Sequence, residues 1–321
     1  MKKSYKCEKL EHTIHFLPDK IKFCCSCAEG PGFSITDFSQ INKKEIQNNK
    51  NKFINALKSG IIPQECSGCF DYFEIEEKNL IKDFISTFKT KKIKHIIIDH
   101  FKQCDCACVY CSQKILFPNV IQNYEILPLI EQMYKYNMFD EDLMVEFQGG
   151  NVSMLKEFDA LMDKFNQNNC NHFHILTNGI KYLTKIEQIA QEKKCTICVS
   201  LDCGTKETFK KIKGIDAFEQ TTNNIRKLTK LKKANPKLKY ILIQGINDNK
   251  EEITAFLEFA KSLEKLDSIV FEIDYRDILF VKEGNNKVPN HYKDLFLYAE
   301  NYCKENKIPF FVNEFIKSFL K

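Results

Sequence analysis

The segment Phe101–Gln113, FKQCDCACVYCSQ, constrains what this chain can be more than any other stretch. Cys104, Cys108 and Cys111 form a C-x3-C-x2-C pattern directly after the apolar run Ile96–Ile98. A cubic 4Fe–4S cluster normally takes four thiolates, so a loop that supplies three leaves one iron open to a small molecule. The alternative is a zinc loop or a group of free thiols, although structural zinc sites usually combine two C-x2-C pairs.

Together with Tyr110, the aromatic residue before the last cysteine, this pattern resembles the radical S-adenosylmethionine (radical SAM) superfamily. In that family the open iron binds the amino and carboxylate groups of S-adenosylmethionine, and the reduced cluster cleaves this ligand to a 5'-deoxyadenosyl radical. The resemblance implies a 4Fe–4S cluster on the three cysteines, S-adenosylmethionine as its partner, and an electron donor such as a flavodoxin or ferredoxin. Cys106, inside the loop, is expected to be a bystander.

The cysteine content and the N-terminus bear on the compartment. The chain has 321 residues and 15 cysteines, more than packing requires. Its first residues, MKKSYKCEKLEHTIHF, lack the continuous apolar segment of a signal peptide, and no apolar run reaches the roughly 18 residues of a membrane-spanning helix. These features predict a cytoplasmic protein whose cysteines bind a metal or cluster instead of forming disulfides.

The net charge of +5 does not indicate nucleic-acid binding. Of the 48 basic residues only Arg226 and Arg276 are arginines, and the lysines are spread along the whole chain. A nucleic-acid-binding surface would concentrate them in a stripe. We therefore expect neither nucleic acid nor a membrane as a partner.

A second group of cysteines lies in residues 1–70. His12–Phe16 and Ile21–Phe23 have the pattern of two strands joined by a turn at Pro18–Lys20, and Ile41–Ser59 has the apolar spacing of a helix. This order resembles the SPASM and twitch auxiliary-cluster modules of the same superfamily, although here it precedes the barrel. The resemblance implies an auxiliary iron–sulfur cluster on Cys7, Cys24 or Cys25, Cys66 and Cys69, with Cys27 as a spare ligand. A zinc ion on the same cysteines is the alternative.

From Ile93 onward strands and helices alternate. The predicted strands are Lys94–Asp99, Leu143–Phe147, His172–Leu176, Thr196–Leu201, Leu238–Gln244 and Ser268–Asp274. Between them the apolar spacing predicts the helices Leu127–Met138, Met154–Asn168, Ile180–Lys193, Ala217–Lys233 and Lys250–Leu266. Six such units predict an α/β fold, a partial (β/α)6 TIM-like barrel with chemistry at the carboxyl ends of its strands.

We expect the chain to divide into four parts. Residues 1–70 would form the small cysteine-rich module, residues 71–92 a connecting helix, residues 93–280 the barrel, and residues 281–321 a C-terminal helical extension.

The carboxyl end of the second predicted strand reads Gln148–Asn151, QGGN. The family commonly has Gly-Gly-Glu here, and its backbone carbonyls and carboxylate receive the ammonium group of S-adenosylmethionine. Asn151 replaces the acid, and an amide accepts a hydrogen bond without the assistance of a charge. The alternative is that Asn151 caps the following helix.

The later strand ends carry further motifs of the family in order. Thr177–Gly179 (TNG) is expected to place Asn178 at the ribose or methionine part of the ligand, and Ser200 and Asp202 lie on one side of their strand. Gly245 and Ile246 are assigned to the adenine, and Asn247–Asn249 to helix capping. The resemblance thus implies the cofactor-binding set Tyr110, Gly149, Gly150, Asn151, Asn178, Ser200, Asp202, Gly245 and Ile246. Glu272, Asp274 and Arg276 share a face of the sixth strand, as an ion network or as substrate contacts.

The sequence therefore predicts a radical SAM enzyme that abstracts hydrogen from a substrate at the mouth of the barrel. An auxiliary cluster accepts an electron or binds substrate in related enzymes. That role favours a peptide, a protein, or a glycan or its nucleotide-linked precursor as substrate. The competing hypothesis is a non-catalytic zinc-binding scaffold or interaction module on the same barrel.

Overall fold

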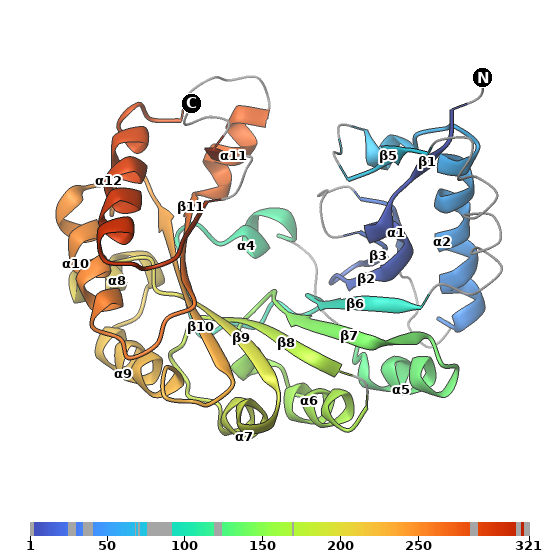
Figure 1. Ribbon diagram of the computed structural model, residues 1–321, viewed down its shortest axis with the longest axis horizontal. Helices are drawn as coiled ribbons and strands as arrows, with labels where there is room; N and C mark the ends of the chain where they lie inside the picture. The colour runs from blue at the N-terminus through green and yellow to red at the C-terminus, as the bar shows by residue number, and fades with distance from the viewer. Residues whose placement is uncertain are drawn as a thin grey trace. The chain divides into compact units, whose positions relative to one another are not determined.

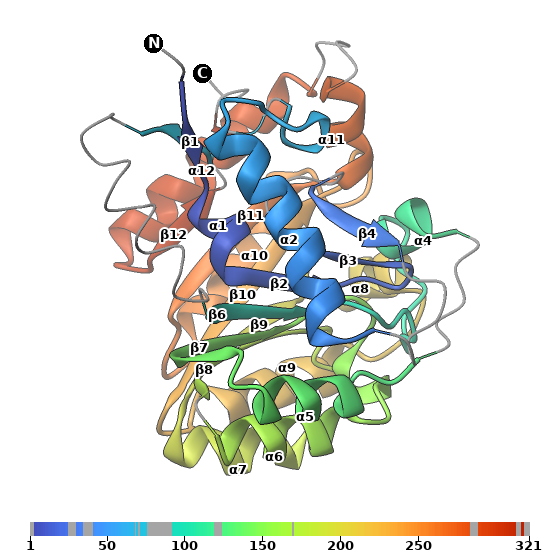
Figure 2. The same cartoon turned by 90° about the vertical axis from the view of Figure 1, so that its right-hand side faces the viewer.

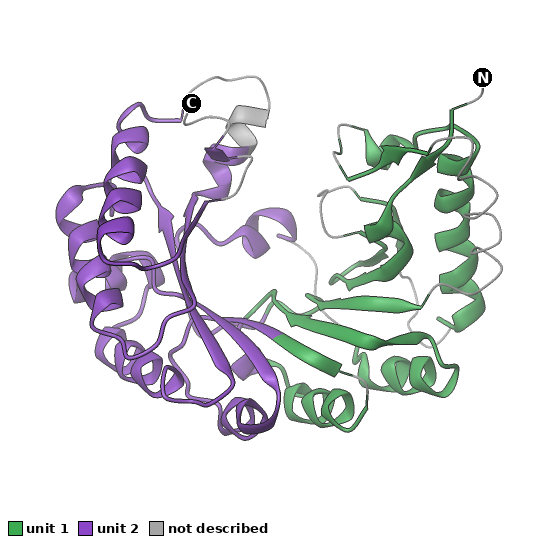
Figure 3. Ribbon diagram, viewed as in Figure 1, with its two compact units in different colours: residues 1–102, 119–150, 155–173 green, residues 103–118, 151–154, 174–321 purple. Residues whose placement is uncertain are grey.

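The computed structural model describes residues 3–24, 30–34, 41–67, 69, 71–75, 92–118, 124–168, 170–282, 288–312 and 316–317. The chain divides into two compact units (Figure 3). Unit 1 comprises residues 1–102, 119–150 and 155–173, and unit 2 comprises residues 103–118, 151–154 and 174–321. Strand β8 (Cys170–Thr177) contributes residues to both.

The strands of unit 1 follow the hydrogen-bonded order β7-β6-β2-β3-β4 (Figure 1). β6 (Ile93–Ile98) pairs in parallel with β7 (Phe139–Phe147) on one side and with β2 (Thr13–Phe16) on the other. β3 (Lys20–Lys22) and β4 (Gly32–Ser34) continue the sheet in antiparallel pairing. These five strands of unit 1 therefore form one mixed sheet.

The predicted N-terminal hairpin is present and belongs to this sheet. The amide of Leu17 donates to the carbonyl of Lys20 at 2.9 Å and closes the turn. Thr13 lies opposite His95, and Phe16 opposite Ile98, in the parallel pairing of β2 with β6. The structure thus joins the first strands of the predicted auxiliary module to the first strand of the predicted barrel, and the boundary at residue 70 stays a prediction.

The helices of unit 1 are α1 (Glu8–His12), α2 (Lys43–Lys58), α5 (Leu127–Lys135) and α6 (Phe158–Asn166). α2 begins where the Asn42 side chain accepts from the amide of Glu45 at 3.1 Å, as an N-cap should. It packs against α1, β4 and the short strand β1 (Tyr5–Lys6) (Figure 2). β1 pairs with β5 (Phe73–Glu74). A 3-10 turn, η2 (Gln64–Cys66), ends at Cys66 and precedes Cys69. The predicted connecting helix falls mostly on residues 76–91, outside the described residues.

Unit 2 contains a parallel sheet in the order β12-β11-β10-β9. β10 (Ala234–Leu242) pairs with β9 (Lys194–Ser200) and with β11 (Ser268–Ile273), and β11 pairs with β12 (Phe310–Val312). β12 is a further strand of the sheet, beyond the six predicted from strand–helix alternation, and it lies within the residues expected to form a C-terminal helical extension.

The larger helices of unit 2 pack on one side of these strands (Figure 1). α7 (Thr184–Glu192) packs against β9, and α9 (Phe218–Leu228) packs against β10. α12 (His291–Glu305) packs against α10 (Lys250–Lys261) and β12. No described helix is long and apolar enough to cross a membrane. The helices and turns of the unit are η3 (Val152–Met154), α4 (Ser112–Leu116), α7 (Thr184–Glu192), α8 (Lys206–Lys213), α9 (Phe218–Leu228), α10 (Lys250–Lys261), α11 (Tyr275–Lys282) and α12 (His291–Glu305).

Alternation along β10 separates an apolar side from a polar one. Tyr240 is fully buried, and its ring stacks on that of Phe271 with the centroids 4.9 Å apart, while Phe256 packs edge-on at 4.9 Å. Lys239, the next residue back, lies on the opposite side and pairs with Glu272 of β11 at 2.5 Å. Side chains thus alternate between the two faces of the sheet, and helices cover its apolar face, as the predicted α/β architecture requires.

Gly149→Ala is expected to destabilise the protein more than Gly245→Ala does. Both glycines have positive φ, 100° and 73°, so each substitution should cost about 1–2 kcal/mol of unfolding free energy. A Cβ on Gly149 would also lie 2.6 Å from Asp99 Oδ1 and 2.8 Å from the Phe101 carbonyl oxygen, whereas a Cβ on Gly245 meets nothing within 4 Å. That overlap should add about 1–3 kcal/mol. Urea denaturation of both variants measures the difference, and equal losses would contradict this explanation.

Candidate functional site

The loop of residues 103–113, called here the three-cysteine loop after the predicted ligands Cys104, Cys108 and Cys111, is anchored on the end of α8. The amide of Ala107 donates to the carbonyl of Lys213 at 2.8 Å, and that of Val109 donates to the carbonyl of Ile212 at 3.0 Å. α8 ends at Gly214, whose φ of 71° is in the left-handed region that favours glycine. These contacts hold the middle of the loop by its backbone, which leaves its cysteine side chains available.

Three thiols of this loop form a hydrogen-bonded group. The Cys106 thiol donates to Cys104 and to Cys108, and these bonds lower the pKa of Cys104 to about 6 and that of Cys108 to about 7 against the opposing effect of burial. The pKa of Cys106 is raised because its own thiol is the donor. The amide of Cys111, at the start of α4, donates to the Cys108 carbonyl at 3.4 Å. Two of the three predicted cluster ligands therefore favour the thiolate, which is the metal-binding form.

Lys213 brings a buried positive charge next to these thiols. Its side chain is 1% exposed, and its Nζ donates to the Tyr110 hydroxyl at 2.7 Å and to the Asp202 carboxylate. Burial disfavours the ammonium, but attraction to Asp202 and Cys108 outweighs it and raises the pKa of Lys213. The lysine is therefore charged, and this charge contributes to the lowered pKa of Cys108.

Asp202 is fully buried, and its carboxylate has internal partners. Oδ1 accepts from the amide of Ile241 at 3.0 Å, and Oδ2 accepts from Lys213 and Tyr110. Its φ of 62° places it in the left-handed region, and Asn247 holds it there by donating to its carbonyl at 2.7 Å. In this structure the carboxylate binds Lys213 and the loop residue Tyr110, and the ligand contact expected from the sequence stays a prediction.

Asn151 lies within a second polar group of unit 2. It is 1% exposed, and its Oδ1 accepts from the Thr177 hydroxyl at 2.9 Å and from the amide of Asn178 at 3.3 Å. Its Nδ2 donates to the Ser153 hydroxyl at 2.7 Å and to Asp105 Oδ1 at 3.1 Å. The alternative reading of Asn151 as a simple helix cap is therefore incomplete, because its side chain joins two strand ends to the cysteine loop.

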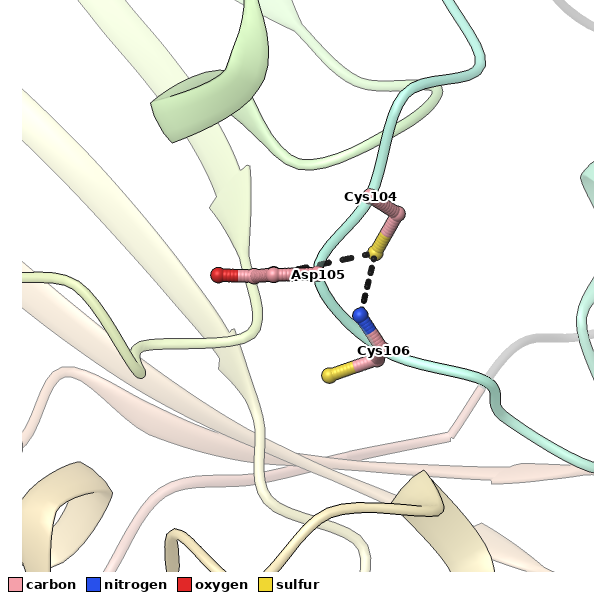
Figure 4. A group of neighbouring side chains, drawn as sticks. All are labelled: Cys104, Asp105 and Cys106. Atoms are coloured by element: carbon pink, nitrogen blue, oxygen red, sulfur yellow. Dashed lines mark hydrogen bonds between the residues drawn. The ribbon is translucent and has the colours of Figure 1, made fainter.

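Asp105 completes this group from the loop itself. Asn178 Nδ2 donates to Asp105 Oδ1 and to the Cys106 sulfur at 3.2 Å. One ligand atom of each of Cys104, Asp105 and Cys106 lies within 4.8 Å of the others, and Figure 4 shows the side chains of Asp105 and Cys106 extending to the same side of the loop. The sequence analysis did not identify Asp105 as a site residue. The one signal for it was the presence of an acidic side chain within the cysteine motif.

The decisive comparison concerns residues 98–260, just over half of the chain, which match the family model of the radical SAM superfamily. The chain belongs to the radical SAM superfamily. Members of this superfamily are enzymes that use a 4Fe–4S cluster and S-adenosylmethionine, so the predicted family, the enzyme class and these two cofactors are confirmed. The auxiliary cluster and the SPASM- or twitch-like module stay predictions. The alternative of a non-catalytic zinc scaffold is not retained.

Curated relatives of this radical SAM chain include GTP 3',8-cyclases. The GTP 3',8-cyclase of Clostridium botulinum (strain Okra) is 23% identical over 224 residues, which cover 68% of this chain and 63% of that protein. The protein of the same name from Lactiplantibacillus plantarum is 26% identical over 191 residues, which cover 57% of this chain and 53% of that protein. The matches thus span less than two thirds of the length of these relatives.

Solved radical SAM structures share the fold. The structure of Streptococcus suis SuiB bound to its precursor peptide SuiA has a TM-score of 0.55 and 14% identity, and the match covers 84% of this chain and 62% of SuiB. The structure of anSMEcpe with bound AdoMet has a TM-score of 0.52 and 17% identity, with 68% of this chain and 61% of that chain covered. At these identities the likeness shows the fold alone, and it confirms the partial-barrel fold class.

The loop residues fit the cluster that radical SAM membership implies. The thiols of Cys104 and Cys108 favour the thiolate, Cys104 is exposed, and a buried ammonium offsets the negative charge that several thiolates bring together. The roles of Cys104, Cys108 and Cys111 as its ligands are nevertheless predictions carried over from the motif.

The other predicted S-adenosylmethionine contacts lie at strand ends. Ser200 is the last residue of β9 and lies opposite Lys239 of β10. Gly245 is exposed just after β10, with its amide donating to Asp248 at 2.8 Å, and Ile246 beside it is half-buried. The structure brings these residues to the carboxyl ends of the strands of unit 2, and their individual roles stay predictions.

In unit 1, Gly149 and Gly150 follow β7. The amide of Gly150 donates to the Phe101 carbonyl at 2.8 Å, and the positive φ of Gly149 allows the chain to pass close to Asp99. Only glycine fits at position 149 without displacing its neighbours, so Gly149 has a structural role that is independent of ligand binding.

Two buried polar side chains support the strand ends of unit 2: Glu252, which the sequence did not reveal, and Asn247, which the sequence assigned to helix capping. Glu252 accepts from the amide of Gly204 at 2.8 Å and from the Thr208 hydroxyl at 2.7 Å, which fixes the start of α8. Asn247 donates to the Ile241 carbonyl at 2.8 Å and so bridges the chain after β10. Of the run predicted to cap a helix, Asn249 does so, because its side chain accepts from the amide of Glu252 at 2.9 Å.

The polar residues of the sixth predicted strand form ion pairs. Glu272 of β11 pairs with Lys239, and Arg276 pairs with Asp274. β11 ends at Ile273 and Arg276 belongs to α11, so the expectation that Glu272, Asp274 and Arg276 share one face of the strand is wrong. Arg276 Nε lies 3.0 Å from Asp274 Oδ2. Of the two readings left open by the sequence, the ion network is the one that these contacts show.

The described N-terminal cysteines of unit 1 affect one another through their charges. Cys7 Sγ accepts from the amide of Leu10 at 3.5 Å, and Cys69 Sγ accepts from the amide of Asp71 at 3.5 Å. Burial raises the pKa of Cys66 to about 12, and the thiols of Cys24, Cys69 and Cys7 add to this shift. Cys25 and Cys27 lie outside the described residues, so the choice between Cys24 and Cys25 as ligand stays a prediction.

Proposed function

We propose that this protein is a radical SAM enzyme that modifies a peptide or protein by abstracting a hydrogen atom. The observation that carries the proposal is the thiol group of Cys104, Cys106 and Cys108 beside the buried ammonium of Lys213, in a chain of this superfamily. The fold likeness to SuiB, solved with a precursor peptide and covering 84% of this chain, supports a peptide substrate over the nucleotide of the cyclase relatives.

In this proposal Cys104, Cys108 and Cys111 hold a 4Fe–4S cluster. With S-adenosylmethionine and one electron from a flavodoxin or ferredoxin, such a cluster would supply the cleavage of S-adenosylmethionine to methionine and a 5'-deoxyadenosyl radical, which would take a hydrogen atom from the substrate. The residues of the chain bind and orient. Lys213 favours the thiolates by its charge, and Asn178, Ser200, Gly245 and Ile246 receive the nucleoside and methionine parts of the ligand.

The N-terminal cysteines have a separate role in the proposal. Cys7, Cys24, Cys66 and Cys69 would hold an auxiliary iron–sulfur cluster, for which four thiolates are the usual ligand set. Amide hydrogen bonds to Cys7 and Cys69 support it, because hydrogen bonds to the sulfurs are among the factors that set the potential of such clusters. Metal analysis distinguishes this auxiliary cluster from the alternative, a zinc ion bound by the same four cysteines.

The triple variant Cys104→Ala, Cys108→Ala, Cys111→Ala tests the function directly. After anaerobic reconstitution with iron and sulfide, the wild-type protein should form 5'-deoxyadenosine from S-adenosylmethionine and dithionite, and the triple variant should form none, because its loop lacks the ligands. Cys303→Ala, which removes a buried thiol of α12, is the matched control. Formation of 5'-deoxyadenosine by the triple variant would refute the assignment.

A further inference from the structure

Asn151 is the place where this chain departs from its family, since the family commonly has an acid there to receive the ammonium group of S-adenosylmethionine. In this structure the side-chain oxygen of Asn151 already accepts two hydrogen bonds, from the Thr177 hydroxyl and the Asn178 amide. An amide oxygen has two lone pairs, so both are in use. The side chain instead presents its Nδ2 donor to Asp105, and a donor cannot receive an ammonium group.

The carboxylate of Asp105 is hydrogen-bonded directly to the side chain of Asn151. Its Oδ1 accepts from Asn151 Nδ2 at 3.1 Å, from Asn178 Nδ2, and from the Cys104 thiol at 3.9 Å. Two amides from two strand ends therefore orient one oxygen of this carboxylate. The amides leave its negative charge uncompensated, because an amide carries no net charge.

The second oxygen of Asp105 is available to a cation. Among the residues that the structure describes, Oδ2 has no hydrogen-bond partner and Asp105 forms no ion pair. Asp105 is half-buried. A partly desolvated carboxylate without a counter-ion is unfavourable, and a cation that binds it gains a charge-assisted hydrogen bond.

We propose that Asp105 supplies the carboxylate that binds the ammonium group of S-adenosylmethionine, in place of the acid that Asn151 replaces. The inference rests on the proposed function of the three-cysteine loop. It assigns Asn151 a positioning role, because Asn151 holds Asp105 and joins it to Thr177 and Asn178.

Asp105→Asn is the first test, because it removes the charge and keeps an Oδ1 acceptor for Asn151 and Asn178. We expect the affinity of the anaerobically reconstituted enzyme for S-adenosylmethionine, measured by equilibrium dialysis, to fall at least about tenfold, as for the loss of a charge-assisted hydrogen bond. The affinity for 5'-methylthioadenosine, which lacks the amino-acid part, should not change. Iron content is measured in parallel and should equal that of the wild type.

The double variant Asp105→Asn, Asn151→Asp is the matched control. It exchanges the amide and the carboxylate across one hydrogen bond, keeps the net charge, and returns an acid to the position that the family uses. We expect it to recover most of the lost affinity for S-adenosylmethionine, so the two substitutions should be strongly non-additive.

The outcomes separate this inference from the proposed function. If the wild type binds S-adenosylmethionine and Asp105→Asn binds it equally well, the inference is overturned and the function stands. If Asp105→Asn loses affinity for both ligands alike, Asp105 acts on the site as a whole and the inference is again overturned. If the wild type does not bind S-adenosylmethionine at all, the proposed function fails and the inference fails with it.

Discussion

Replacing Cys66 and Cys69 by alanine is expected to halve the iron of the reconstituted protein, from about eight atoms to about four, without abolishing 5'-deoxyadenosine formation. The two cysteines belong to unit 1, and the loop of Cys104 belongs to unit 2. The loop is anchored on α8 by contacts within its own unit, so loss of the N-terminal ligands leaves it in place. Iron and sulfide analysis, with chromatography of the nucleoside product, measures both quantities.

A pair of cysteines outside the N-terminal group, both buried, provides the control for this variant. Cys170→Ala and Cys195→Ala together remove the same number of thiols from β8 and β9, and we expect the iron content to stay unchanged. Full iron content in the Cys66 and Cys69 variant would refute an auxiliary cluster on these residues. Zinc in the wild-type protein at one atom per chain, lost in the variant, would establish the zinc alternative instead.

The sequence predicted those parts of this molecule that depend on local patterns. Period-two alternation predicted the strands, apolar spacing predicted the helices, and the cysteine spacing predicted the family. Boundaries differed where a local turn intervened. The helix expected at Met154–Asn168 is a 3-10 turn over Val152–Met154 followed by a helix that begins at Phe158, and the helix expected at Ala217–Lys233 ends at Leu228.

Contacts between distant residues were not predictable in this way. Lys213 belongs to the lysine-rich stretch Lys210–Lys213, where composition favours a solvent-exposed side chain. It lies four residues after the buried Phe209 and therefore on the same face of α8. That spacing was the one available signal, and it does not identify Asp202 and Tyr110 as its partners. Likewise, the alternation of β2 predicted a strand and not its pairing with β6.

Lys213→Met is expected to lower the free energy of unfolding by about 3–5 kcal/mol, because it leaves the Asp202 carboxylate buried without its cation. Asp202 is fully buried and would keep only the Tyr110 hydroxyl and the Ile241 amide as donors to its carboxylate. Since the Lys213 carbonyl also receives the amide of Ala107, the loop should loosen as well. Urea denaturation measures the first effect, and faster hydrogen exchange of the loop amides measures the second.

An exposed lysine of the same helix separates this explanation from a general effect of losing a charge. Lys206 pairs with Asp216 at 3.5 Å with both side chains about half exposed, so Lys206→Met should cost less than about 1 kcal/mol. Adding Asp202→Asn to Lys213→Met should restore part of the lost stability, because the uncompensated charge disappears while an oxygen remains to accept from the Ile241 amide. Equal losses for the two lysine variants, or a further loss in the double variant, would show that the unpaired Asp202 carboxylate is not the source of the lost stability.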